Sequence, residues 1–280
     1  MAHRRFTVRQ CLLTVMVVGW HDFLLKYHGS VLGYLWSLIG PIVKFLVIYH
    51  VTRPFVADGI DNYPLYLFLG IILFEHFSNT TLGCVSMLLN KESMVSKIAF
   101  PRILLPLMVG WTNLIVFLTY FLIFIVFSMI YGTYPTWSYL WVPVILLQMT
   151  LISLGVGMVL SAYSLKYRDI EHLWSLVLYV LFWLTPIFYA RPTEGPIWKS
   201  LLHFIDGFGY PSLTRIFDGF VQFQPLSLLM QDARRILLYS ATAGIPSAVH
   251  VIGFTCICFA MFWCGARIFR SRSRYFIEEY

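Results

Sequence analysis

Apolar residues are concentrated along this chain in six long runs, which are separated by short polar connections. A helix rises 1.5 Å per residue, so a hydrocarbon core of about 30 Å is crossed by about 20 residues. The runs reach or approach that length, and we predict six transmembrane helices. Their expected bounds are 35–56, 65–88, 103–131, 137–163, 173–190 and 246–269.

Composition supports the same fold class. Hydrophobic residues make up 59% of the 280 residues and charged residues 12%, whereas soluble domains carry about 25% charged residues. The chain is therefore expected to be an all-α integral membrane protein. Its net charge of +7 is spread over short connections, which favours a role in membrane topology over nucleic-acid binding.

Lysine and arginine are distributed unevenly between the connections. Segments 57–64 and 132–136 contain none, whereas 90–102, 164–172 and both ends of the chain, including the tail 270–280, are basic. The positive-inside rule then places both termini in the cytoplasm. Six crossings agree with that placement.

The N-terminal region 1–34 is expected to remain outside the spans. Its apolar run Cys11–Trp20 follows three arginines, as in a signal peptide, but no small-residue cleavage site comes after it. The run is too short to cross a bilayer. We predict a helix that lies along the cytoplasmic interface.

A second irregular region, 191–245, separates the fifth and sixth spans and should lie on the outer side. Its clearest pattern begins at Pro225, after which apolar residues recur at helical spacing with Arg234 and Arg235 off their face. We predict one or two re-entrant or interfacial helices here. The apolar positions are Leu226, Leu229, Met230, Ala233 and Leu237.

The connection after the second span is charged and has a helical composition. One interpretation is a solvated loop that only obeys the positive-inside rule; the other is a helix, 90–98, that docks on a cytoplasmic partner. Arg168 and Asp169 allow a similar choice between a local ion pair at the start of the fifth span and a partner-facing role. The docking candidates are Asn90, Lys91, Glu92, Ser93, Lys97 and Arg102.

Aromatic residues account for 18% of the chain, and two groups stand at helical spacing. Such stripes usually serve packing or form interfacial belts. The alternative is a channel lining whose flat faces stack on sugar rings. The candidates are Tyr34, Phe45 and Tyr49 in the first span, and Tyr179, Phe182 and Trp183 in the fifth.

Lys44 and Glu75 are charges within the first and second spans. A charge at the bilayer centre costs about 2.5–3.5 kcal/mol on insertion scales. Each should therefore face a partner, water or the bundle interior. Structural pairing, a role in a translocation pathway and snorkelling to the interface all remain open.

Several chemistries lack their motifs. The sequence contains no phosphate-binding G-x-x-x-x-G-K-[ST] loop and no H-E-x-x-H, G-x-S-x-G or C-x-x-C motif. No metal site is expected, and the five cysteines lie in apolar runs typical of buried free thiols. A membrane enzyme is poorly supported, and the lack of a two-halves repeat weakens a secondary transporter.

Five segments in order resemble the membrane subunit of type-2 ABC exporters that move O-antigen, capsule or teichoic-acid chains. Two features depart from that pattern: Gly40 and Gln224 precede prolines where the family usually has Asn, and 208–223 looks expanded. The segments are Lys26–Val43 (KYHGSVLGYLWSLIGPIV), Asn90–Leu107, Tyr167–Ile170 with His172, Leu184–Tyr189 (LTPIFY) and Gln224–Leu238 (QPLSLLMQDARRILL).

The resemblance implies a non-enzymatic transport subunit of the bacterial inner membrane. It implies a homodimer with two copies of a separate P-loop ATPase, which would hold ATP and Mg, while this chain holds no cofactor. The cargo would be a lipid-linked polysaccharide, and the ATPase would dock on 90–98 and the Arg4–Tyr27 region. The rivals are an exporter of another lipid or small amphiphile and an ion-coupled secondary transporter using Lys44 and Glu75.

Overall fold

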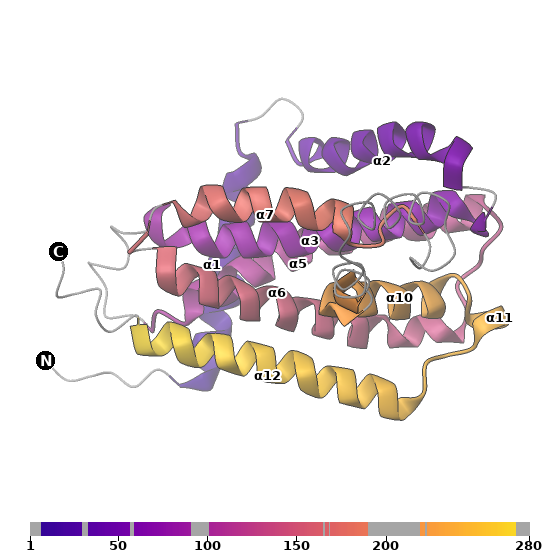
Figure 1. Cartoon of the computed structure of the whole chain (residues 1–280). Helices are drawn as coiled ribbons and strands as arrows, with labels where there is room; N and C mark the ends of the chain where they lie inside the picture. The colour runs from indigo at the N-terminus through magenta and orange to yellow at the C-terminus, as the bar shows by residue number, and fades with distance from the viewer. Residues whose placement is uncertain are drawn as a thin grey trace, which may run out of the picture.

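The computed structural model describes residues 7–29, 33–56, 59–90, 101–164, 166–167, 169–189, 219–221 and 223–272. All regular structure within these residues is helical (Figure 1), which confirms the predicted all-α class. The helices are α1 (Val8–Tyr27), α2 (Leu35–Val56), α3 (Tyr63–Asn90), α5 (Leu104–Ile130), the 3-10 helix η2 (Trp137–Trp141), α6 (Val142–Ser164), α7 (Ile170–Leu184), α10 (Pro225–Leu237), α11 (Ser240–Ala243) and α12 (Ala248–Arg272).

Six helices in the described part of the chain are long and apolar enough to cross a membrane. The number of candidate spans agrees with the prediction, but two helices differ from it. α1, predicted to lie outside the spans, is long and apolar enough to cross a membrane, whereas α7, the predicted fifth span, is too short. The six segments are Val8–Lys26, Leu35–Val56, Tyr63–Met87, Leu104–Ile130, Trp137–Ser164 and Ala248–Arg272.

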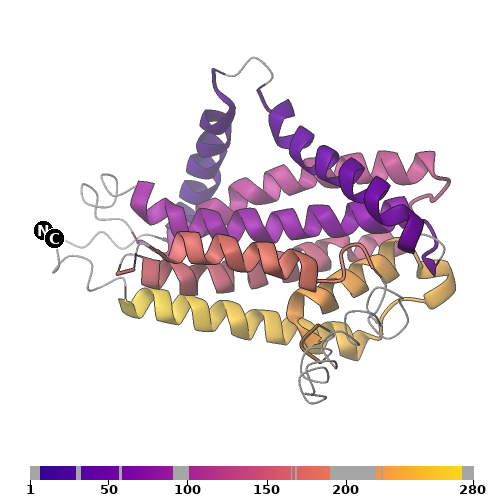
Figure 2. The ribbon, with the colours of Figure 1, turned by 45° about the horizontal axis from the view of Figure 1, so that its top comes forward.

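The N-terminal helix is longer than the apolar run from which it was predicted. It extends from Val8 to Tyr27, about 30 Å at 1.5 Å per residue, because polar residues on both sides continue the helix and Thr7 forms a capping box with Gln10. The expectation that it is too short to span was therefore wrong. Figures 1 and 2 nevertheless show α1 running across the bundle, the course expected of an interfacial helix.

The helix of the predicted fifth span, α7, ends earlier than predicted, at Leu184 instead of residue 190. Its 15 residues span about 22 Å. The cause is Pro186, which disfavours helical geometry in the residue before it; Thr185 is accordingly extended, with φ −79° and ψ 137°. The following residues up to Tyr189 leave the helix but stay buried.

α3 forms the centre of the bundle, between α5 on one side and α6 on the other. Of the six membrane-length segments it is the most buried, with 78% of its apolar window inside the molecule. α12 packs on the far side of α6 (Figure 1). A Cβ at Gly265 would overlap the main chain of Gly155, so glycine at this crossing lets α6 and α12 approach through their backbones.

Proline and cysteine positions add two details of the helices. Pro143 lies in the first turn of α6, where proline is tolerated. All five cysteines are free, as predicted. Cys84 and Cys258 are buried, but Cys256 and Cys264 are exposed on the surface of α12, which corrects the expectation that every thiol is buried.

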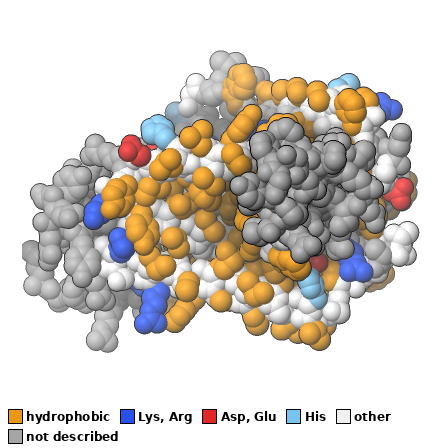
Figure 3. Space-filling model, in the orientation of Figure 1, with side chains coloured by type: hydrophobic (Ala, Val, Ile, Leu, Met, Phe, Trp, Pro, Cys, Tyr) orange, Lys and Arg blue, Asp and Glu red, His pale blue; other side chains and the backbone are white. Residues whose placement is uncertain are grey.

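The outer surface of the bundle is largely apolar. Figure 3 shows hydrophobic side chains over α7, α6 and α12, with Lys and Arg at both ends of the molecule and most of those in view toward the end at which α12 finishes. Exposed apolar residues in this band include Leu173, Val180, Ile252 and Phe259. A surface of this kind suits lipid or another membrane helix.

Candidate functional site

Lys44 of α2 and Glu75 of α3 form an ion pair near the middle of their helices. The Lys44 ammonium donates a hydrogen bond to Oε1 of Glu75, and Asn79 donates to Oε2 at 3.4 Å. The side chain of Lys44 is 40% exposed and that of Glu75 is 18% exposed. Of the alternatives that the sequence left open, mutual pairing is therefore what the structure contains, and it offsets the cost of both charges.

An aromatic ring of α7 lies beside this pair. The Lys44 ammonium lies 5.2 Å from the centroid of Phe182, a cation–π distance. Phe182 in turn packs edge-on against Phe74 of α3 at 5.1 Å. Helices α2, α3 and α7 thus meet around one charged and aromatic cluster, which we name the α2–α3–α7 cluster.

The six aromatic candidates do not act alike in the fold. Phe45 and Phe182 are buried and belong to the core; Phe45 packs against Phe68 and Phe127 at 5.5 and 5.6 Å. Tyr179 and Trp183 are 68% and 48% exposed on α7. Of these four rings, only those of Tyr179 and Trp183 are exposed on the surface of the protein.

The two remaining aromatic candidates are half-buried. Tyr49 stacks on Phe45 at 5.6 Å and so extends the α2–α3–α7 cluster along α2. Tyr34 lies away from it and packs against Phe23 of α1 at 5.2 Å. Helical spacing had grouped Tyr34 with Phe45 and Tyr49, whereas the structure separates it, because it precedes the first turn of α2.

The break after α7 leaves main-chain carbonyls inside the protein, and Arg234 of α10 satisfies them. Its guanidinium donates to the oxygens of Pro186 at 2.6 Å and Ile187 at 2.8 Å, and to that of Tyr66 at 3.3 Å. The guanidinium carbon also lies 3.4 Å from the centroid of the Tyr66 ring. Irregular backbone at membrane depth is tolerated only where the protein satisfies it in this way.

Two tyrosines of α3 complete the arrangement. Tyr63 donates its hydroxyl hydrogen to the oxygen of Phe188 at 3.0 Å, and Tyr66 donates to Tyr189 at 2.8 Å. On the same helix, a Cβ at Gly70 would come within 2.7 Å of the Arg234 guanidinium. Glycine at this position therefore makes room for the arginine.

The placement of Arg234 corrects the sequence analysis. All five apolar positions predicted for α10 are buried, but Arg234, expected off their face, is only 3% exposed. The signal was present: Arg234 follows Met230 by four residues and so shares its face of the helix. Only Arg235 is exposed as expected.

Several predicted cytoplasmic residues lie outside the described part of the chain. These are Lys91, Glu92, Ser93, Lys97 and Arg168, together with nearly all of the expected docking helix 90–98 and much of the outer region 191–245. Asn90 is the last residue of α3, and Arg102 lies in the turn before α5. Asp169 precedes α7, where its main-chain oxygen accepts from Leu173 without a side-chain cap.

Among the described residues, no group of three or more His, Cys, Asp or Glu could hold a metal ion. The helices surround an ion pair and aromatic rings, an arrangement typical of a polytopic membrane protein.

Comparison with known proteins defines the class further. Residues 14–212 match the family model described as ABC-2 type transporter, and the chain belongs to this family. Members of this family are membrane subunits of transporters and are not themselves enzymes, as was predicted from the sequence.

Relatives are similar at modest identity. The chain is 26% identical over 255 residues to the O-antigen export system permease protein RfbA of Myxococcus xanthus, covering 91% of this chain and 90% of the relative. It is 29% identical over 177 residues to a protein of the same name from Klebsiella pneumoniae, covering 63% and 68%. A second Klebsiella relative is 28% identical over the same length.

Proposed function

We propose that this chain is the membrane-spanning subunit of an exporter that moves a lipid-linked polysaccharide across the bacterial inner membrane. One observation carries the proposal: similarity to the O-antigen export permease of Myxococcus xanthus extends over nine-tenths of both chains. A match of that extent includes the helices from α2 to α11 and, between them, the break after α7. It is not confined to a shared apolar run.

The subunit works with a separate ATPase, as ABC permeases do. The proposed assembly contains two copies of this chain and two ATPase subunits, which bind ATP and Mg, whereas this chain binds neither. Exposed apolar faces on α2 and α7 support a second copy: Val43, Val47, Val177 and Trp183 are all at least 47% exposed. In the dimer these faces would enclose the polysaccharide path.

Both termini are proposed to be cytoplasmic. α12 ends in Arg270 and Arg272, at the end of the bundle where most of the Lys and Arg in view lie (Figure 3). α3 and α6 end, and α5 and α7 begin, at that same end of the bundle (Figure 1). The positive-inside rule places this end in the cytoplasm.

The test of the cargo is made in the native host. Deleting the gene should abolish the surface polysaccharide and cause its lipid-linked form to accumulate on the cytoplasmic side. Complementation with the wild-type chain should restore surface polysaccharide. An unchanged surface in the deletion strain would rule out the proposed cargo.

The ATPase contact is tested by co-purification from native membranes. Wild-type chain should bring down a P-loop ATPase in stoichiometric amount. Replacing 90–98 by a Gly/Ser linker should abolish the association while the chain stays monodisperse. Retention of the ATPase by the linker variant would place the docking surface elsewhere.

A further inference from the structure

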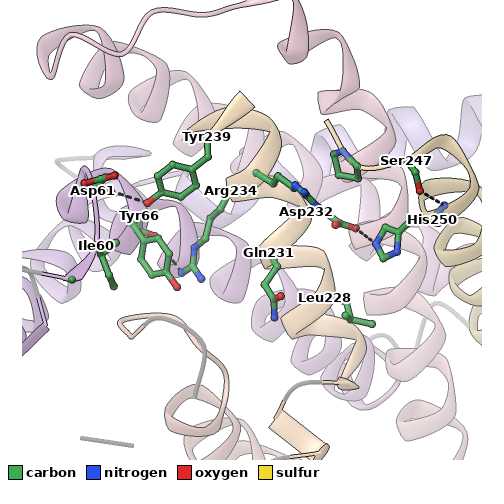
Figure 4. A pocket seen from close by; sticks show the side chains of 13 residues that line it. Ile60, Asp61, Tyr66, Leu228, Gln231, Asp232, Arg234, Tyr239, Ser247 and His250 are labelled. Atoms are coloured by element: carbon green, nitrogen blue, oxygen red, sulfur yellow. Dashed lines mark hydrogen bonds and ion pairs between the residues drawn. The ribbon is translucent and has the colours of Figure 1, made fainter. Parts of the chain in front are cut away.

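A pocket with both polar and apolar walls lies at the end of the bundle where α3 and α12 begin, opposite the end at which α12 finishes. It is formed between the start of α3, α10 and the start of α12 (Figure 4) and has a volume of about 750 Å³. Pockets that enclose small organic ligands measure about 300–1,000 Å³. Tyr66 and Arg234, which hold the break after α7, form part of its wall, whereas the other lining residues belong neither to that break nor to the α2–α3–α7 cluster.

The lining supplies hydrogen-bond donors and acceptors together. Asp61 and Arg235 are exposed at the pocket, and Gln231 is half-buried in its wall. Tyr239 donates to the main-chain oxygen of Asp61 at 2.7 Å, so this bond does not use the Asp61 carboxylate. Burial raises the pKa of Tyr239 to about 12, so that its hydroxyl keeps its proton at neutral pH.

The charges on the described lining balance. Two arginines, Arg234 and Arg235, stand with two aspartates, Asp61 and Asp232. The Arg234 guanidinium donates hydrogen bonds to main-chain oxygens. The Asp232 carboxylate forms a hydrogen bond with Nε2 of His250 at 3.0 Å. A phosphate site would have an excess of cationic donors, and a site for a divalent cation would have an excess of carboxylate oxygens. The balanced lining fits neither.

Mixed donors and acceptors of balanced charge suit a neutral ligand that is rich in hydroxyl groups, because a hydroxyl both donates and accepts. The half-buried ring of Tyr239 adds apolar wall to the same cavity, against which the C–H face of a sugar ring can lie. A saccharide meets all of these conditions together.

We propose that this pocket binds a neutral sugar unit of the exported chain on the far side of the membrane. The inference rests on the proposed function and adds to it a site outside the membrane path. Binding there would hold glycan that has already crossed and oppose its return.

The test uses the full chain with its native ATPase, in cells that synthesise the polysaccharide. A photo-crosslinking p-benzoylphenylalanine replaces Gln231 in one strain. In a control strain it replaces Val249, which is 82% exposed at the same end of the bundle and does not line the pocket. Irradiation should attach glycan to the permease at Gln231 and not at Val249, and only while polysaccharide is being made.

A pocket-filling variant provides an independent readout. Ser247→Trp should lower surface polysaccharide several-fold at an unchanged membrane level of the permease, and Val249→Trp should leave it unchanged. Adducts at Gln231 that carry phospholipid instead of glycan would overturn the inference. So would the absence of glycan adducts together with full export by Ser247→Trp.

The failures of the two proposals can be told apart. If the deletion strain keeps its surface polysaccharide, the proposed function fails and the pocket inference fails with it. If wild-type chain restores the polysaccharide but the pocket variants behave as wild type, only the pocket inference fails.

Discussion

A buried arginine is costly unless its donors are used, and Arg234 uses two of its nitrogens on three main-chain oxygens. Those oxygens belong to α3 and to the segment after α7, so one side chain of α10 connects three parts of the fold. Because the segment is not helical, the arginine substitutes for the helical hydrogen bonds that Pro186 prevents.

Removal of Arg234 should therefore destabilise the protein strongly. Each buried carbonyl that loses its partner costs about 1–3 kcal/mol, so Arg234→Gln should lower the free energy of unfolding by about 3 kcal/mol or more. Thermal unfolding in detergent measures the effect. Arg235→Gln, next to it but exposed, is the stability control and should stay within about 0.5 kcal/mol of wild type; equal losses in both variants would contradict this role.

Lys44 and Glu75 should show coupled effects. Either Lys44→Met or Glu75→Gln leaves one charge at membrane depth without its partner, and the double variant removes both charges. The double variant should be more stable than the two single losses predict, by about 1 kcal/mol or more. A double-mutant cycle measured by thermal unfolding tests this, and additive losses would show that the contact contributes nothing.

At the scale of elements, α7 combines a structural face and an open face. Phe182→Ala removes a buried ring and should destabilise the chain by about 3–5 kcal/mol. Tyr179→Ala changes an exposed ring and should alter stability by no more than about 0.5 kcal/mol, yet it should lower polysaccharide export. Surface polysaccharide measured at matched permease levels separates the two effects; full export by Tyr179→Ala would remove this ring from the path.

The crossing of α6 and α12 depends on glycine. Gly265→Leu would place a side chain against the main chain of Gly155 and should force the helices apart, with loss of monodisperse protein in size-exclusion chromatography. Gly253→Leu on the same helix is the control, since a Cβ there meets no atom within 4 Å. Normal elution of Gly265→Leu would mean that α12 can repack.

The elements show what the sequence can predict. The bounds of α2 agree with the predicted 35–56 because polar or conformationally special residues flank its apolar run. The end of α7 was predicted less accurately from the sequence, because the apolar pattern continues through Pro186 to Tyr189. The break is stabilised by side chains distant in sequence: Arg234, 47 positions after Ile187, and Tyr63 and Tyr66 of α3. Spacing along one helix does not reveal such partners.

The candidate site was predicted in part for the same reason. Lys44 and Glu75 stood out because charge is rare in apolar runs, and the structure pairs them. The aromatic candidates were chosen by spacing, which does not distinguish the buried Phe182 from the exposed Tyr179 when every neighbour is apolar. Tyr63 and Tyr66 gave no signal, since tyrosine near a membrane interface is common.

For the whole molecule, the open faces of α2 and α7 predict a dimer. Only 17% of the apolar window of α2 is buried within one chain, and the Lys44 side chain on it is 40% exposed. A second copy would cover both. Native mass spectrometry of the detergent-extracted complex should therefore find two copies of this chain, and a complex with a single copy would contradict the arrangement.

The bond between Arg234 and the segment after α7 also bears on how the protein is made. Ribosomes add about 5–20 residues per second, so the arginine that satisfies Ile187, 47 residues upstream, is synthesised about 2–9 seconds after it. During that interval the carbonyls of Pro186 and Ile187 lack the arginine that satisfies them in the finished protein. These two carbonyls would then stay in water or beside an insertase until α10 is made, so this part of the bundle closes after α10 is synthesised and not strictly in the order of synthesis.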